Sequence, residues 1–228
     1  MYKEKLRTSA GAFFEKYKHL LLLLYFVVYL IWFSYLEKTV TKHFHVIHLT
    51  LDDYIPFCEV FVVPYLLWFV YVAWGVVYFA LHDKKDYYRL CAFLFTGMTI
   101  FLIVSTLYPN GHYLRPATFE RDNIFTALVQ MVYSSDTATN LFPSIHVYNS
   151  IGIHLAVMQS RDFRNRPRVK VLSGILMVSI ILSTMLIKQH SVFDVLTAFL
   201  TAGGMYGLVY ARSWEKQPRK IPANIPQI

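Results

Sequence analysis

Long apolar runs alternate with short polar segments along the whole chain. Six of these runs approach the ~20 residues with which an α-helix crosses a bilayer. We expect spans at residues 19–36, 58–81, 90–108, 144–159, 171–187 and 191–211. The pattern therefore predicts an all-α, polytopic integral membrane protein, in which residues 1–228 form a single membrane domain with six transmembrane helices.

One polar connection, residues 109–143, is longer than the others. Within it Ile124 and Leu128 recur at helical spacing, and either Asp122 or Asn123 could cap a helix that starts there. We expect a short amphipathic helix lying at the outer membrane interface.

Hydrophobic residues make up 56% of the chain and charged residues 16%, which is too apolar for an ordinary soluble domain. The net charge of +8 could indicate a nucleic acid partner, but the basic residues gather in the N-terminal arm, around residues 84–89 and 161–170, and in the C-terminal tail. This bias predicts that both termini face the cytoplasm, and no nucleic acid is needed to explain the charge. The basic residues left for the outer side are Lys38, Lys42, Arg115, Arg121 and Lys188.

The segment KQHSVFD interrupts the apolar pattern between the last two spans and contains Lys188, His190 and Asp194. Ionisable residues at membrane depth are costly, so we take them as candidate functional residues. His190 and Asp194 are four residues apart and share one helix face, where the carboxylate can fix the tautomer of the imidazole. The structural alternative is an interfacial histidine beside a Lys188–Asp194 ion pair.

A second histidine, His146, opens the fourth span directly after Pro143 and Ser144. The N–H groups in the first turn of a helix readily bind phosphate. One imidazole that attacks phosphorus, a second that protonates the leaving oxygen, and nearby cations would form a phosphoryl-transfer site. The topology places His146, His190 and Arg115 at the same membrane face.

The sequences RP at 115–116, PSIH at 143–146 and HSVFD at 190–194 occur in an order that resembles the type-2 phosphatidic acid phosphatase superfamily. That family has a six-helix membrane core and the pattern K-x6-RP, PSGH and SR-x5-H-x3-D. The resemblance implies that His190 is the nucleophile that forms a phosphohistidine, that His146 is the acid, and that Asp194 orients the nucleophile. It also implies that Arg115 and Ser144 bind phosphate.

Three positions differ from the family pattern. Tyr108 stands in place of the first lysine, Ile145 replaces the glycine, and Thr184 replaces the arginine after a matching Ser183. We therefore include Tyr108 and Ser183 among the candidate phosphate-binding residues, together with Lys188 and Arg121, which could restore the missing charge. On an ideal helix Lys188 would point ~200° away from His190, so it contributes only if the helix breaks there.

The expected function is a metal-independent lipid phosphate phosphatase with no cofactor, acting on a lipid phosphate or pyrophosphate at the extracytoplasmic face of a bacterial plasma membrane. The spelling of the motifs is closer to the branch related to inositol phosphorylceramide synthases, so a phospholipid headgroup phosphotransferase is the alternative. An inactive scaffold and a transporter are further alternatives. The histidines at positions 43, 45 and 48 suggest zinc, but no cysteine lies nearby, so we expect an interfacial loop and no metal. The lipid and the oligomeric state stay open.

Overall fold

The computed structural model describes residues 15–211. The basic residues of the N-terminal arm before residue 15 and of the tail after residue 211 lie outside this part of the chain; they are Lys3, Lys5, Arg7, Arg212, Lys216, Arg219 and Lys220. The helical elements are η1 (Lys18–Leu24), α2 (Tyr25–Thr39), α3 (Thr50–Tyr54), η2 (Glu59–Phe61), α4 (Val62–His82), α5 (Lys84–Leu107), α6 (Ile124–Ser135), α7 (Ile145–Gln159), α8 (Pro167–Leu186) and α9 (Val192–Val209). Two short strands, β1 (His45–Val46) and β2 (Asn110–Gly111), pair in parallel.

Five helices in the described part of the chain are long and apolar enough to cross a membrane: Glu15–Thr39, Glu59–His82, Lys84–Leu107, Pro167–Leu186 and Val192–Val209. The chain is therefore a mostly helical protein whose helices are compatible with a membrane location, as the sequence predicts. The expected fourth span corresponds to α7, which has 15 residues and falls short of the length of the other five. A six-span arrangement stays a prediction.

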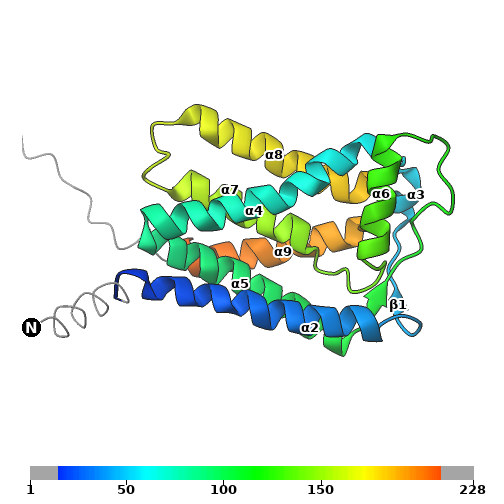
Figure 1. The fold of residues 1–228 in the computed structure, drawn as a ribbon, viewed down its shortest axis with the longest axis horizontal. Helices are drawn as coiled ribbons and strands as arrows, with labels where there is room; N and C mark the ends of the chain where they lie inside the picture. Colours follow the sequence, from blue (N-terminus) through cyan, green and yellow to red (C-terminus); the bar gives the residue numbers. More distant parts are fainter. Residues whose placement is uncertain (1–14, 212–228) are drawn as a thin grey trace, which may run out of the picture.

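Helix α7 lies at the centre of the bundle, where it packs against α4, α5, α8 and α9 (Figure 1). Close packing depends on small residues: a side chain at Gly97 of α5 would collide with Tyr148, and one at Gly152 would collide with Phe93. Because α7 is enclosed by protein, it carries buried polar residues such as Asn149 at little cost from lipid contact.

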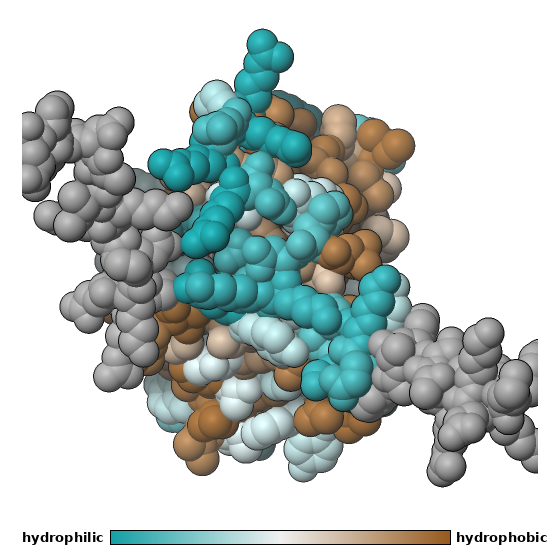
Figure 2. All heavy atoms as spheres, turned by 90° about the vertical axis from the view of Figure 1, so that its left-hand side faces the viewer, coloured by the Kyte–Doolittle hydropathy of each residue, from teal (hydrophilic) through white to brown (hydrophobic). Residues whose placement is uncertain are grey.

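One end of the bundle carries the basic connections. Asp83 caps α5 by accepting hydrogen bonds from the N–H groups of Lys85 and Asp86, so the helix begins six residues before the expected start at residue 90. Hydrophilic side chains gather over this end (Figure 2). They include the basic residues that line a polar recess, namely Lys85, Arg89, Arg161, Arg164 and Lys170.

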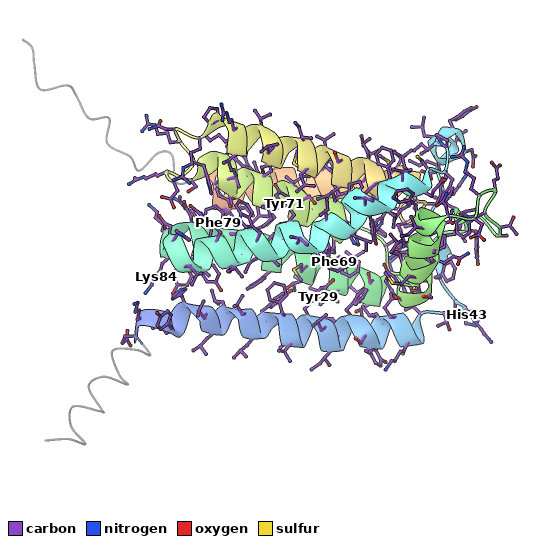
Figure 3. All side chains as sticks on the ribbon, turned by 45° about the horizontal axis from the view of Figure 1, so that its top comes forward. Tyr29, His43, Phe69, Tyr71, Phe79 and Lys84 are labelled. Atoms are coloured by element: carbon purple, nitrogen blue, oxygen red, sulfur yellow. The ribbon has the colours of Figure 1, made fainter. Side chains whose placement is uncertain are left out.

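The opposite end is closed by loops and by α6, which lies across the ends of the long helices (Figure 1). The helix expected within residues 109–143 is therefore present, and Asn123 caps it through the N–H groups of Phe125 and Thr126. Pairing of β1 with β2 ties the loop after α2 to the loop after α5. Lys84 and His43 mark the two opposite ends in Figure 3.

Candidate active site

A tight loop between α8 and α9 holds His190. The carbonyl oxygen of Thr184 accepts hydrogen bonds from the N–H groups of Gln189 (2.9 Å) and His190 (3.0 Å). Lys188 adopts a positive φ of 53°, which reverses the chain direction after α8 ends. Ser191 then caps α9 by accepting the N–H of Phe193. The loop therefore has a defined geometry, which a catalytic histidine needs.

His190 and Asp194 interact as their spacing predicts. The ring Nδ1 of His190 lies 3.3 Å from Oδ2 of Asp194, and the same oxygen accepts the N–H of Ser191 at 2.9 Å. Because a carboxylate only accepts, Nδ1 carries the proton and Nε2 keeps its lone pair. Burial, followed by the charge of Arg115, lowers the pKa of His190 to about 3, so the ring is neutral at pH 7.

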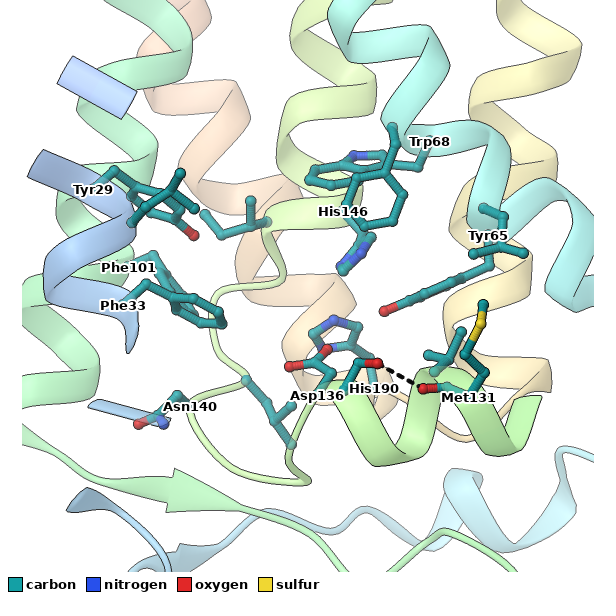
Figure 4. Close-up of a pocket in the computed structure, with 17 residues that line it drawn as sticks. Tyr29, Phe33, Tyr65, Trp68, Phe101, Met131, Asp136, Asn140, His146 and His190 are labelled. Atoms are coloured by element: carbon teal, nitrogen blue, oxygen red, sulfur yellow. Dashed lines mark hydrogen bonds between the residues drawn. The ribbon is translucent and has the colours of Figure 1, made fainter. Parts of the chain in front are cut away.

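His146 faces His190 from the first turn of α7. The two ring centroids are 5.6 Å apart, and no hydrogen bond joins the rings (Figure 4). Two aromatic rings of α4 hold His146: Tyr65 stacks on it at 4.5 Å and Trp68 lies at 4.3 Å. Its Nε2 is buried without a partner among the described residues. Burial disfavours the charged form of this imidazole, so the ring is held neutral until a negative charge binds beside it.

His146 and His190 line a cavity of about 420 Å³ at the end of the bundle that α6 closes. The walls come from α2, α4, α5, α6 and the start of α7, and most of the lining side chains are apolar or aromatic. Tyr29 of α2 and Phe69 of α4 are directed towards the space between these two helices (Figure 3). Leu30, Phe69 and Met131 line the cavity and are also exposed on the bundle surface, so the cavity opens sideways between α2 and α4.

Two polar side chains in this cavity were not predicted from the sequence. The hydroxyl of Tyr65 points into the space between His146 and His190, and the carboxyl of Asp136 lies beside His190 (Figure 4). Neither group has a hydrogen-bond partner on another described side chain. Burial, followed by the charge of Glu37, raises the pKa of Asp136 to about 7, against an opposing effect of Arg115.

Arg115 lies behind the cavity wall and not in it. Its guanidinium donates to the carbonyl oxygens of Asp136 (2.9 Å), Thr137 (2.9 Å) and Tyr133 (3.3 Å), and to Oε1 of Gln189 (2.5 Å). It also stacks over the ring of Tyr133. The two terminal nitrogens of the guanidinium therefore hold loops together, although the family resemblance predicts that they bind phosphate. The third nitrogen, Nε, is buried without a partner in the described structure.

The other two predicted cations lie outside the cavity. The helix does break before Lys188, but the ammonium donates to the carbonyl oxygens of Asp52 (2.8 Å) and Ile55 (2.5 Å). Arg121 is 75% exposed and lies 3.4 Å from Glu59. In this conformation protein acceptors direct Lys188 elsewhere and solvent surrounds Arg121, and their replacement of the missing family cations stays a prediction.

Three further candidates have structural positions. Ser144 caps α7 through the N–H of Val147, and its own N–H donates to the carbonyl of Asp194, so it joins the two histidine-bearing segments. Ser183 is buried and donates back to Ile180 of its own helix, away from the cavity lining. Tyr108 stacks on His45 at 4.0 Å, also outside the cavity. Of the three, Ser144 alone lies next to residues that line the cavity.

His112 was also missed in the sequence, because nothing in its spacing relates it to His190. Its Nδ1 accepts the N–H of Leu114, so Nε2 carries the proton and donates to the carbonyl of Gln189 at 3.0 Å. Burial lowers the pKa of His112 to about 4, which keeps this neutral arrangement at pH 7. His112 supports the His190 loop from behind.

The histidines of the loop after α2 are separated from one another. His45 stacks on Tyr108, and His48 lies 2.8 Å from Asp53 at the surface. Within residues 15–211, no group of three histidine, cysteine, aspartate or glutamate side chains has the arrangement of a metal site.

No family model, curated protein or solved structure matches this chain. The candidate site therefore rests on the residues of this chain and on their geometry.

Proposed function

We propose that the protein is a membrane-embedded phosphatase or phosphotransferase that acts on lipid phosphates through a phosphohistidine on His190. One observation carries this proposal: His190, held by Asp194, faces His146 across the polar end of an otherwise apolar, sideways-opening cavity. A nucleophile, its orienting carboxylate and a second proton-carrying group are the parts that nucleophilic phosphoryl transfer requires. Phosphatase-like motifs around the same three residues give independent support.

In the first step, Nε2 of His190 attacks phosphorus, and a P–N bond forms while the P–O bond to the leaving group breaks. His146 donates a proton to the departing oxygen, which leaves as an alcohol or a phosphate. Asp194 stabilises the positive charge that develops on His190. His146 can hold the proton that it donates once the anionic phosphate lies beside it, because that negative charge offsets the cost of burying an imidazolium.

In the second step, the acceptor attacks the phosphorus of the phosphohistidine. His146 takes the proton of the acceptor hydroxyl, the P–N bond breaks, and neutral His190 is restored. Water as acceptor gives a phosphatase, and a lipid alcohol gives a phosphotransferase. A lipid alcohol would enter by the same sideways opening as the substrate.

The developing negative charge has fewer cations around it than the family pattern implies. Support comes from the field of Arg115, whose charge acts on His190 from behind the cavity wall. The hydroxyl of Tyr65 and the N–H groups at the start of α7 supply further donors. Hydrogen-bond donors therefore replace part of the missing charge.

We place this end of the bundle on the extracytoplasmic side of a plasma membrane, as in a bacterial inner membrane. The basic connections lie at the other end, and such residues mark the cytoplasmic side. Six spans and two cytoplasmic termini follow if α7 crosses the membrane inside its sheath of neighbouring helices.

The test uses the purified full chain in detergent with EDTA, supplied with lipid monophosphates, lipid pyrophosphates and phosphodiester lipids. Free phosphate and new phospholipids are both measured. An alkaline denaturing quench after reaction with phosphate-labelled lipid traps phosphohistidine, which is acid-labile and base-stable. His190→Ala is compared with wild type, and Asp162→Asn at the opposite end serves as the matched control.

We expect turnover and trapped label in wild type and in Asp162→Asn, and neither in His190→Ala. Free phosphate as the product identifies a phosphatase, and a new phospholipid identifies a phosphotransferase. Turnover that persists in His190→Ala contradicts the mechanism. Folded protein that binds lipid without any turnover supports the scaffold alternative and rejects the enzyme.

A further inference from the structure

The cavity contains a carboxyl group that the proposed chemistry does not use. Asp136 lines the cavity beside His190, and its backbone carbonyl, not its carboxylate, accepts from Arg115. No described residue donates a hydrogen bond to the carboxylate. A carboxyl group next to a phosphate site repels a dianion, so its position calls for a separate role.

Asn140 lines the same cavity and supplies a second unsatisfied acceptor. Its Nδ2 donates to Oε1 of Glu37 at 2.9 Å, and because a carboxylate cannot donate, this bond fixes the orientation of the amide. Oδ1 of Asn140 is buried and has no partner among the described residues, although the residue is only 4% exposed. This oxygen lies beneath the cavity surface, so a ligand cannot reach it unless the side chain moves.

Glu37 does not take part in ligand binding in this arrangement, because its oxygens are already occupied. Oε2 accepts the N–H and the hydroxyl of Thr137 at 3.0 and 2.6 Å, while Oε1 accepts from Asn140. Two charged groups thus act on the pKa of Asp136: Glu37 raises it and Arg115 lowers it. Among the described residues, Asp136 therefore carries the carboxylate that lines this end of the cavity without a hydrogen-bond partner.

We propose that Asp136 forms a headgroup subsite for a phosphodiester lipid whose headgroup carries a primary ammonium or a hydroxyl group. An unpaired carboxylate requires a hydrogen-bond donor, and a phosphodiester brings one negative charge where a monoester brings two. The scarcity of cations in the cavity fits that single charge, since Lys188 and Arg121 are directed elsewhere. The inference rests on the proposed function only for the position of the phosphate, beside His190.

The experiment measures competitive lipid binding to the full chain by native mass spectrometry after delipidation. The probes share the same acyl chains: phosphatidylethanolamine, phosphatidylcholine, phosphatidylglycerol and phosphatidic acid. Ethanolamine and choline carry the same charge, but choline has no N–H donor, so this pair isolates the hydrogen bonds. Glycerol and ethanolamine distinguish a hydroxyl from an ammonium donor.

We compare Asp136→Ala and Asp136→Asn with wild type. Ser135→Ala is the matched control, because Ser135 lines the same cavity but its hydroxyl donates back to Met131. We expect wild type to prefer the ethanolamine lipid over the choline lipid about tenfold, as one or two hydrogen bonds to a carboxylate predict. Asp136→Ala should lose the preference, Asp136→Asn should retain binding of the hydroxyl headgroup, and Ser135→Ala should behave like wild type.

Equal binding of the ethanolamine and choline lipids by wild type overturns the proposal. So does strongest binding of phosphatidic acid, or an equal loss of all four lipids in Asp136→Ala. The same measurement on His190→Ala separates this inference from the proposed function. A headgroup preference without turnover supports the subsite and rejects the proposed enzyme. Turnover without a headgroup preference supports the enzyme and rejects the subsite.

Discussion

Oδ2 of Asp52 accepts a hydrogen bond of 2.6 Å from the hydroxyl of Ser191, the residue that follows His190. Oδ1 of Asp52 accepts the N–H of Val192 at 2.7 Å, and Asp52 is only 2% exposed. Since the N–H of Ser191 donates to Asp194, the carboxylate in α3 acts on both members of the His190–Asp194 pair through the loop between them. Asp52 is a positioning residue.

Asp52→Asn should reduce kcat by about 10²-fold with little change in KM, because a small displacement of the nucleophile is sufficient for such a loss. The amide places donors against a hydroxyl and an N–H that need acceptors. Asp53→Asn is the control, since Asp53 pairs with His48 at the surface. Equal effects of the two variants, or a change in KM alone, would contradict the positioning role.

Asp194→Asn should reduce turnover by about 10³-fold or more, because the amide no longer selects the tautomer that keeps Nε2 of His190 unprotonated. A rapid alkaline quench should show slower formation of phosphohistidine. A variant that forms the intermediate at the normal rate would show that Asp194 serves only the fold.

Arg115→Lys should lower the melting temperature, because one ammonium cannot satisfy three carbonyl oxygens and Gln189 together. Each acceptor left unpaired costs about 1–3 kcal/mol. Thermal unfolding in detergent measures this loss. Unchanged melting with a raised KM would instead identify Arg115 as a direct phosphate ligand.

Asp136 should make stability fall as the pH rises from about 4 to about 7. Its folded pKa of about 7 exceeds the value of 3.8 for an unperturbed carboxyl, so the folded protein keeps a proton that the unfolded chain has released. His112 acts in the opposite direction, with a folded pKa of about 4 against 6.5, so its contribution is lost as the pH falls through that window.

The difference in melting temperature between wild type and Asp136→Asn separates the effect of Asp136 from that of His112. We expect the variant to gain in melting temperature, relative to wild type, more at pH 8 than at pH 5. Equal differences at the two pH values would show that Asp136 keeps an ordinary pKa.

Tyr65→Phe should lower kcat/KM by about 10²-fold, the loss typical of a single donor to a developing charge. Tyr29→Phe is the control, because Tyr29 lines the opposite wall of the cavity (Figure 4). Initial rates on the preferred lipid measure both. Equal rates for Tyr65→Phe and wild type would leave that hydroxyl with a packing role.

The long helices and the His190–Asp194 pair were accessible from the sequence, because both follow from periodicities within one segment. The length and spacing of an apolar run predict a helix from that segment alone, and residues four positions apart in a helix lie on the same face. The proximity of His146 and His190 could be predicted only from the expected topology, which places both residues at the same membrane face. In the structure their ring centroids are 5.6 Å apart.

The rest of the site depends on contacts between distant segments. Asp52 reaches Ser191, and Tyr65 reaches the space beside His146, only once the loops and α4 are in place. Lys188 shows the converse: the break in its helix was considered in advance, but the two carbonyls that capture its ammonium belong to another loop. A charge in a sequence does not indicate which acceptor will bind it.

If the long helices cross a bilayer, as we propose, the opening between α2 and α4 connects the cavity with the surrounding lipids. A ligand arriving that way diffuses in two dimensions, and its effective concentration is its mole fraction among the neighbouring lipids. Adding inert detergent at a fixed amount of ligand should therefore slow occupancy, although the bulk molarity of the ligand barely changes. The affinity of this protein for a lipid should therefore be expressed as a mole fraction and not as a molar concentration.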